Sequence, residues 1–449
     1  MVLIDEALRR REAEANPVRV GMVGAGFMAR GLARQLHQAL PGIRLVAIAN
    51  RTPAKAHDVL QHAGHVDVRN VDDPSQLDRA IASGATGVTT DPQVLCASAS
   101  VDVVIEATGA VEFGAHVLTG AIAQRKDVVS MNAELDATVG PILQARARDA
   151  GVLVTGADGD QPAVQVNLAR FVRSLGLTPL VYGNVKGLQD RYRTPATQAS
   201  YAAQWGQTPE MVTSFADGTK ISMEQALVAN ALDATVARRA MIGPEHRGHV
   251  DDLRGTFLDA LGMKRLHELG GIVDYVVGAN PSPGVFVLAA NDDPEREIYL
   301  RYGKLGDGPL YSFYVPYHLT ALEVPLSVAR VVLFRDHIVS SRPCAPRVDV
   351  VACAKRELRT DDILDGLGGF LTYGVCERGE VAANEGLVPI GIAEGSRLRR
   401  AVPRDRVLTY DDVELPEGRL VIDLRREQEE RLGHEVASSS TPRRGVHNG

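Results

Sequence analysis

Short apolar runs alternate with segments of helical apolar spacing through the first part of the chain. The run at residues 18–23 is long enough for one buried strand, and residues 27–40 then repeat apolar side chains at helical spacing. Further strands are expected at residues 44–50, 101–107, 127–132 and 152–156. This alternation predicts an α/β fold that begins with a doubly wound parallel sheet of the Rossmann type, in a domain spanning residues 1–160.

The turn after the first strand carries Gly24, Gly26 and Ala29 in the order G-x-G-x-x-A. In this pattern the first glycine permits a tight turn, the second lets backbone N–H groups approach a pyrophosphate, and the alanine keeps the helix close to the sheet. Phe27 and Met28 open the helix, whose positive N-terminus would face the phosphates. The turn therefore predicts dinucleotide binding, with a purely structural turn as the alternative.

The end of the second strand predicts which cofactor binds. An acidic residue at that position would accept hydrogen bonds from the ribose 2′-hydroxyl and favour NAD. This chain has Asn50 and Arg51 there, and its next carboxylate is Asp58. Since an arginine can pair with a 2′-phosphate, NADP is predicted; the alternative interpretation of Arg51 is a solvated loop charge.

Two later strand ends are expected beside the nicotinamide ribose. The strand at residues 101–107 is followed by Thr108 and Gly109, and the strand at residues 127–132 ends at Asn132. Ligands of doubly wound domains bind beyond the carboxyl ends of the strands. All three residues are therefore predicted to contact the cofactor.

The pattern changes beyond Pro162. A helix is expected at residues 163–175 and a strand at 180–187. Further along the chain, a helix is expected from 221 to about 233 and strands at 271–277 and 283–288. We predict a central α+β domain for catalysis and dimerisation at residues 161–345. A β-rich unit is expected at 346–434, followed by a disordered, Ser/Pro/Arg-rich tail at 435–449.

Composition and charge narrow the classes of function. The 449 residues carry 49 Lys and Arg against 56 Asp and Glu, a net charge of −7, which argues against non-specific nucleic-acid binding and gives no support for a basic membrane patch. The four cysteines form no CxxC pair and no zinc spacing. No signal-peptide core or membrane span is expected, so we predict a cytoplasmic protein with reduced thiols and a small-molecule substrate.

Reduction of a carbonyl by a nicotinamide needs a donor that stabilises the developing alkoxide. Lys186 ends an apolar strand and Lys220 opens a helix, and both would reach the cofactor cleft if the second sheet packs against the nucleotide domain. A solvent-exposed lysine is the alternative for each. Asp160, at the domain boundary, is a candidate to bind substrate hydroxyls or a metal, or to hold a catalytic lysine. Asp217 and Glu224 complete the predicted catalytic set.

Two further ligand sites remain open alternatives. A ketose rearrangement before reduction would benefit from a divalent cation such as Mg²⁺ or Mn²⁺, for which no ligand set can be assigned. Arg191, Arg193 and Lys186 could bind a substrate phosphate, although a solvated polar loop explains the arginines equally well. His246 and His249 are interpreted as loop residues rather than a metal pair because Pro244 and Gly248 disfavour a helix there. The sequence has no G-x-S-x-G, P-loop or HExxH motif.

These motifs together resemble homoserine-dehydrogenase-like oxidoreductases that carry a C-terminal SAF-like domain, over about residues 5–430. The nucleotide and central domains contribute the glycine turn and the segments 106–109, 129–134, 156–162 and 217–220. The SAF-like domain contributes residues 350–356 and 364–369.

The resemblance implies a homodimeric, NADPH-dependent enzyme. The activity associated with this architecture is reductoisomerase-like, converting 1-deoxy-D-xylulose 5-phosphate to 2-C-methyl-D-erythritol 4-phosphate in isoprenoid precursor synthesis. Homoserine dehydrogenases carry a lysine directly after the asparagine that matches Asn132, whereas this chain has Ala133, so Lys186 and Lys220 remain the candidates for that role. The alternatives are a dehydrogenase of another small hydroxy or keto metabolite and a non-catalytic nucleotide-sensing regulator.

Overall fold

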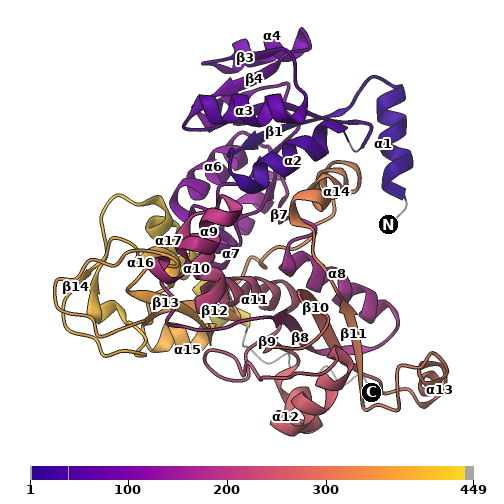
Figure 1. The fold of residues 1–449 in the computed structure, drawn as a ribbon, viewed down its shortest axis with the longest axis vertical. Helices are drawn as coiled ribbons and strands as arrows, with labels where there is room; N and C mark the ends of the chain where they lie inside the picture. The colour runs from indigo at the N-terminus through magenta and orange to yellow at the C-terminus, as the bar shows by residue number, and fades with distance from the viewer. Residues whose placement is uncertain (1–2, 39, 440–449) are drawn as a thin grey trace, which may run out of the picture.

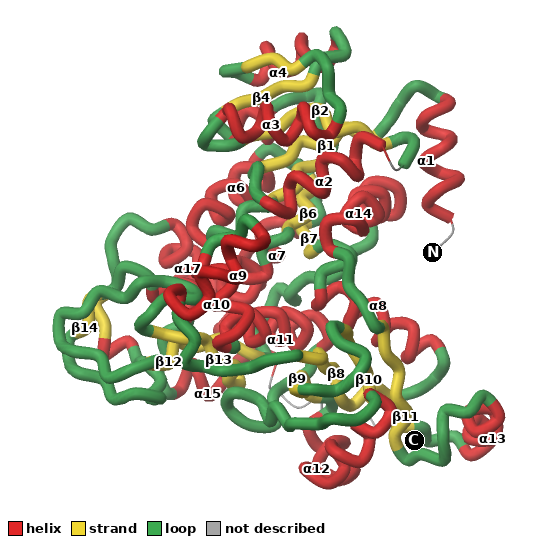
Figure 2. The backbone as a smooth tube through the Cα atoms, in the orientation of Figure 1, coloured by secondary structure: helices red, strands yellow, loops and turns green. Residues whose placement is uncertain are grey.

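The computed structural model describes residues 3–38 and 40–439. The nucleotide domain lies at one end of the molecule, a second sheet at the other, and a third unit beside them (Figure 1). In the tube view the strands of these parts form separate sheets joined through helices (Figure 2). No helix in the described ranges has the length and apolar character needed to span a bilayer.

The first sheet has seven parallel strands in the order β3-β4-β2-β1-β5-β6-β7. The chain leaves β1 toward β2 on one side and returns to β5 on the other, which creates the crevice where doubly wound sheets bind ligands. The predicted Rossmann-type sheet is confirmed. Its strands are β1 (Val18–Val23), β2 (Ile43–Ala49), β3 (Val68–Asn70), β4 (Thr86–Thr89), β5 (Val103–Glu106), β6 (Asp127–Ser130) and β7 (Val154–Gly156).

Helices cover both faces of this sheet. Met22 and Ile105 face the core shared with α2, α3 and α14, whereas Val104 and Val128 face the core on the side of α4 to α7. Aspartates cap α4 and α5, and a proline follows each cap at the first helical position. The helices of the domain are α1 (Leu3–Ala13), α2 (Phe27–Gln38), α3 (Pro53–Ala63), α4 (Pro74–Ala82), α5 (Pro92–Ala97), α6 (Val111–Ala123) and α7 (Ala133–Ala150).

The second sheet is mixed, with the order β11-β10-β8-β9 and only the β8–β9 pair parallel. It contains the strands expected at residues 180–187, 271–277 and 283–288, together with β11. Its strands are β8 (Thr178–Lys186), β9 (Ile272–Val277), β10 (Gly284–Ala290) and β11 (Leu310–Val315). Its helices and short turns are α8 (Gln161–Ser174), α9 (Pro195–Trp205), α10 (Pro209–Asp217), α11 (Thr219–Leu232), η1 (Val250–Asp252), α12 (Leu253–Leu269), α13 (Pro294–Tyr302) and α14 (Thr320–Phe334).

Strand alternation gives this sheet two different faces. Tyr182 shares a core with α8 and α11, while Val181 and Phe286 pack with Phe257 of α12 on the opposite face. Polar residues on the face of Tyr182 are therefore directed toward α8 and α11. Helix α14 packs on α2 of the nucleotide domain and so joins the two sheets. The first turns of α8 and α11 lie at this junction.

The third unit contains two short antiparallel sheets, β12–β13 and β14–β15. Its elements are β12 (Val348–Ala354), β13 (Thr372–Arg378), α15 (Gly379–Asn384), α16 (Ile390–Ala393), β14 (Arg397–Leu398), η2 (Tyr410–Asp412), β15 (Val413–Glu414) and α17 (Leu420–Ser439). The SAF-like assignment and the domain boundaries stay predictions.

Helix α17 returns from the third unit to the nucleotide domain. Arg425 pairs with Asp349 of β12, and the side chain of Gln428 accepts a hydrogen bond of 3.2 Å from the backbone N–H of Ile142 in α7. Helix α17 extends to Ser439, and Leu432 is buried in the core; the disordered tail expected at residues 435–449 stays a prediction. Residues 440–449 lie outside the described residues.

Candidate active site

The glycine turn has the geometry that a dinucleotide requires. Gly24 has a φ of +113°, and a Cβ there would lie 2.9 Å from the carbonyl oxygen of Ala107, so the position accepts only glycine without strain. A Cβ at Gly26 would meet no atom within 4 Å, which leaves the backbone open to a ligand. Phe27 and Met28 are exposed at the start of α2. The turn therefore fits the pyrophosphate of a nicotinamide dinucleotide.

The residues after β2 leave one guanidinium available. Asn50 uses its side-chain amide to donate a hydrogen bond of 2.8 Å to the carbonyl of Thr52. Asp58 pairs with Arg30 at 2.6 Å, so this carboxylate is already engaged. Arg51 is exposed, and no residue in the described ranges forms a hydrogen bond or ion pair with its side chain. Arg51 is therefore free to meet an incoming phosphate.

The loops after β5 and β6 are held by internal hydrogen bonds. Thr108 donates to Glu106 from its backbone N–H, at 2.8 Å, and from its hydroxyl. Gly109 has a φ of +67°. Asn132 caps α7 by accepting from the N–H of Leu135 at 3.0 Å and donates to the carbonyl of Ala110 at 3.1 Å. Asn132 thus shapes the loop with both of its polar atoms, and its predicted cofactor contact remains a prediction.

Lys220 lies among three carboxyl groups at the junction of the sheets. Its ammonium donates a hydrogen bond of 2.7 Å to Glu134, which begins α7 after β6. The side chains are 11% and 5% exposed. Burial lowers the pKa of Lys220, but the negative charge of Glu134, with smaller contributions from Glu224 and Asp160 when they are ionised, outweighs it and holds the pKa above its usual value. Lys220 is therefore a protonated, buried donor.

Two of these carboxyl groups are harder to ionise than usual. Burial raises the pKa of Glu224 to about 8, although the nearby charge of Lys220 opposes the shift. Burial also raises the pKa of Asp160, which caps α8 by accepting from the N–H of Gln161 at 3.1 Å. At neutral pH the carboxyl of Glu224 consequently holds a proton that it can give up at modest cost.

Lys186 is the second lysine of the predicted set, at the last position of β8. Burial lowers the pKa of Lys186, and the nearby carboxyl group of Glu224 opposes this shift. No hydrogen bond or ion pair reaches its ammonium from any part of the chain that the structure describes. A cation in this position lacks the counter-charge that a bound anion would supply.

His318 joins the cluster without having been predicted. Its Nε2 lies 3.2 Å from the side-chain nitrogen of Gln161, and its Nδ1 is buried without a partner. Burial lowers the pKa of His318, while Asp160 raises it. The histidine follows an aromatic segment and belongs to no spaced motif, so the sequence carries no signal for it.

Three buried side-chain amides have polar atoms without partners. They are Gln165 in α8, Asn184 in β8 and Gln225 in α11, and each is fully buried. Strand alternation puts Asn184 on the face of Lys186, and Gln165 lies one helical turn after Gln161. Buried polar groups in folded proteins are nearly always hydrogen-bonded, to protein or to ordered water, so these amides have capacity for a water molecule or a ligand. Of these three amides, Asn184 could have been noticed in the sequence, because it interrupts an otherwise apolar strand.

Asp217 is not part of the lysine cluster. Its carboxylate pairs with Lys355 at 2.8 Å, and the side chains are 0% and 2% exposed. The same ammonium donates to the carbonyls of Arg193 and Gly369. Burial raises the pKa of Asp217, and Lys355 opposes the shift. These contacts tie the third unit to the turn before α11, which is a structural role rather than the predicted catalytic one.

The arginines predicted to bind phosphate have other contacts. Arg191 lies over the ring of Tyr373, with its guanidinium carbon 5.9 Å from the ring centroid. Arg193 pairs with Asp190 at 3.1 Å. Both arginine side chains therefore already make contacts within the chain.

The described residues contain no group of three or more His, Cys, Asp or Glu side chains arranged to hold a metal. Lys220 interacts with Glu134, Glu224 and Asp160, so its ammonium takes the central position that a divalent cation would need. His246 approaches Thr256 and His249 pairs with Asp251, as expected for loop residues. The site therefore does not fit the Mg²⁺ or Mn²⁺ considered from the sequence.

Two family models match consecutive parts of the chain. Residues 21–155 match the NAD-binding domain of homoserine dehydrogenase, and residues 159–324 match the catalytic domain of oxidoreductase DRL. The second match contains Asp160, Lys186, Lys220, Glu224 and His318. Each match covers less than half of the chain, so the two stretches are similar to NAD-binding oxidoreductase domains. Among curated proteins, none matches it significantly.

Solved structures show only distant likeness. An NAD-binding oxidoreductase from Klebsiella pneumoniae shares 20% identity over 39% of this chain and 43% of its own, with a TM-score of 0.28. An oxidoreductase from Bacillus subtilis shares 12% identity over 72% and 92%, with a TM-score of 0.39. The 1-deoxy-D-xylulose 5-phosphate reductoisomerase from Zymomonas mobilis, in complex with NADPH, shares 17% over 47% and 57%, with a TM-score of 0.32. The chain thus spans less than half of the Klebsiella structure, and similarities this distant indicate no substrate.

Proposed function

We propose that this protein is an NADPH-dependent reductase of a small, anionic carbonyl compound and that Lys220 and Lys186 act on the substrate. The observation that carries the proposal is the junction itself: a protonated lysine held by Glu134 beside a second, unpaired lysine, both partly buried where the two sheets meet. A bound NADPH would supply the hydride. The free guanidinium of Arg51 supports NADPH over NADH.

The two lysines have different tasks in this proposal. Lys220 donates a hydrogen bond to the carbonyl oxygen and stabilises the negative charge that develops there, and Glu134 holds its ammonium in place. Glu224, protonated at neutral pH, gives the proton that converts the alkoxide to the hydroxyl. Lys186 binds the anionic group of the substrate, which supplies the counter-charge that its ammonium lacks.

A phosphorylated deoxyketose is the first substrate to test. The family resemblance implies 1-deoxy-D-xylulose 5-phosphate, and a phosphate would satisfy Lys186. Its carbon skeleton would rearrange before the aldehyde is reduced, with 2-C-methyl-D-erythritol 4-phosphate as the product. The second candidate is a dehydrogenase of another hydroxy or keto metabolite, since the same lysine pair suits any small anionic carbonyl. A non-catalytic nucleotide sensor would not need a buried, unpaired lysine.

In the test, the purified chain and NADPH are mixed with one candidate substrate at a time. The candidates are 1-deoxy-D-xylulose 5-phosphate and a panel of phosphorylated and free keto compounds. NADPH oxidation is followed by fluorescence and the product is identified by mass spectrometry. The proposal predicts oxidation with at least one phosphorylated substrate and little with its unphosphorylated counterpart. A chain that binds NADPH tightly but reduces no compound would refute it and support the regulator. Reduction of a different carbonyl would refute only the reductoisomerase step.

A further inference from the structure

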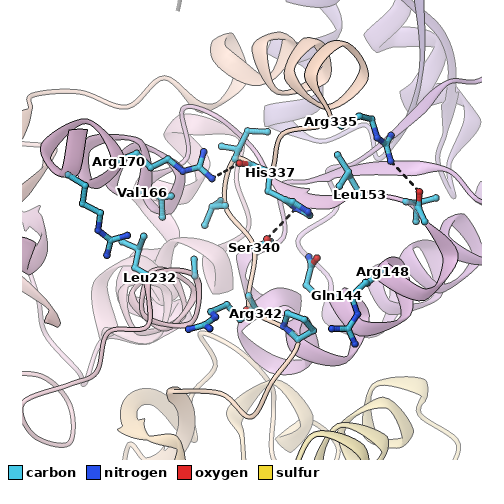
Figure 3. Close-up of a pocket in the computed structure, with 18 residues that line it drawn as sticks. Gln144, Arg148, Leu153, Val166, Arg170, Leu232, Arg335, His337, Ser340 and Arg342 are labelled. Atoms are coloured by element: carbon cyan, nitrogen blue, oxygen red, sulfur yellow. Dashed lines mark hydrogen bonds between the residues drawn. The ribbon is translucent and has the colours of Figure 1, made fainter. Parts of the chain in front are cut away.

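A cavity of about 660 Å³ lies away from the lysine cluster. It is bordered by the end of α7, the later turns of α8, the end of α11 and the segment 335–343 that follows α14 (Figure 3). Leu153 in its wall precedes β7, so the cavity lies toward the amino end of that strand, whereas the lysine cluster follows the carboxyl ends. Its volume is within the range of small-molecule sites.

The cavity is strongly basic. Its lining includes five arginines and His337 and contains no Asp or Glu, and the arginines are Arg148, Arg170, Arg173, Arg335 and Arg342. They come from three separate segments of the chain, and Figure 3 shows Arg148, Arg170, Arg335 and Arg342 on different sides of the cavity. Aspartates outside the lining offset part of this positive charge, and the charge that remains would attract a bound anion.

Three of these arginines lack a close carboxylate partner. Arg148 lies 4.0 Å from Asp149 and Arg170 lies 3.7 Å from Asp336, both beyond hydrogen-bond distance, although Arg170 donates one hydrogen bond of 2.7 Å to the carbonyl of His337. Arg173 donates to the hydroxyl of Tyr182 at 3.0 Å, and it has no ion pair with any residue in the described ranges. Their guanidinium groups therefore retain donors for a ligand.

The remaining two arginines are anchored at the rim. Arg335 pairs with Asp127 and donates to the carbonyl of Gly151, and Arg342 pairs with Asp233 at 3.0 Å. These contacts fix the segment 335–343 across the opening. Apolar side chains, including Val166 and Leu232, form part of the wall, and a wall of low polarity strengthens the attraction between the arginines and an anion.

We propose that this cavity binds a small metabolite with two or more phosphate or carboxylate groups, at a site separate from the lysine cluster. Arginine forks suit phosphate and carboxylate oxygens because each can donate two parallel hydrogen bonds. Arg170 lies nine residues after Gln161 on α8, so at 1.5 Å per residue the two sites are about 14 Å apart along this helix. The inference does not depend on the proposed catalytic chemistry.

The test is calorimetric titration of the full chain with inorganic pyrophosphate, in the presence of saturating NADPH so that the glycine turn and Arg51 are occupied. The proposal predicts saturable binding that weakens as salt is added. The double variant Arg148→Gln/Arg173→Gln should weaken binding at least tenfold. Arg265→Gln, on the exposed surface of α12, is the matched control and should bind as wild type does. Lys186→Met should also bind as wild type does.

Circular dichroism spectra of the variants verify that each is folded. The proposal would be overturned if pyrophosphate did not bind or if NADPH abolished its binding. It would also be overturned if the arginine double variant bound pyrophosphate with wild-type affinity. Loss of binding in Lys186→Met alone would also overturn it, because the anion would then occupy the lysine cluster. Sedimentation velocity adds one more outcome: if the arginine double variant disrupts a dimer while pyrophosphate does not bind, the cavity is part of a self-association surface and the proposal fails.

Discussion

Replacing Lys355 with methionine should destabilise the protein strongly without removing a catalytic group. Lys355 follows β12, and its ammonium lies 2.8 Å from the carboxylate of Asp217. The two side chains are 2% and 0% exposed, so water does not compete for this ion pair. The ammonium also donates to the carbonyls of Arg193 and Gly369 at 2.8 and 2.6 Å. Methionine keeps the length of the side chain and removes all three hydrogen bonds.

The size of the effect follows from the charge that remains. In Lys355→Met the carboxylate of Asp217 stays buried and keeps only the hydrogen bond of 2.8 Å from the N–H of Thr219. Removing one partner of a buried ion pair costs about 3–5 kcal/mol, mostly because the other charge is left uncompensated. The double variant Lys355→Met/Asp217→Leu removes both charges and should recover most of that loss.

The assay is urea unfolding followed by circular dichroism, with Lys264→Met on the exposed surface of α12 as the control. The control should unfold within about 0.5 kcal/mol of wild type. A loss below about 1 kcal/mol in Lys355→Met, or a double variant no more stable than the single one, would refute the structural role given to Asp217.

Three further predictions concern the cofactor, pH and the C-terminus. Arg51→Asp should reverse most of the preference for NADPH over NADH measured by fluorescence titration, and equal affinities in wild type would contradict the assignment. Because the raised pKa of Glu224 lets the native state keep a proton that the unfolded chain has released, stability should fall as pH rises from about 4.5 through about 8. Glu224→Gln should flatten that part of the curve in thermal melts; an unchanged slope would show that other groups cause it. Deleting residues 440–449 should leave NADPH oxidation unchanged, because Arg425 and Gln428, which hold α17, precede the cut.

The local pattern of the sequence was sufficient for most of the fold. The strand, glycine turn and helix at residues 18–38, the parallel sheet and the mixed second sheet follow from apolar periodicity and turn residues, which act over a few positions. Lys186, Lys220, Asp160 and Glu224 were predicted as a set, and the structure brings them together.

The parts that the sequence did not predict depend on contacts between distant positions. Lys355 meets Asp217 across 138 residues, and no local pattern distinguishes this pair from a catalytic aspartate beside a lysine. His318 reaches Gln161 across 157 residues. Gln428 reaches Ile142 across 286 residues, which packs α17 against α7. In each case tertiary packing decides the outcome.

The most direct test of the central claim is the rate of NADPH oxidation by Lys220→Met at saturating cofactor, with the substrate that wild type reduces best. Removing a donor to a developing oxyanion typically lowers turnover by about 100- to 1,000-fold. We predict a loss of that order while NADPH affinity stays at the wild-type value, because Gly24, Gly26 and Arg51 are unchanged, and Lys264→Met should turn over normally. Full turnover by Lys220→Met would contradict the placement of the active site at the lysine cluster.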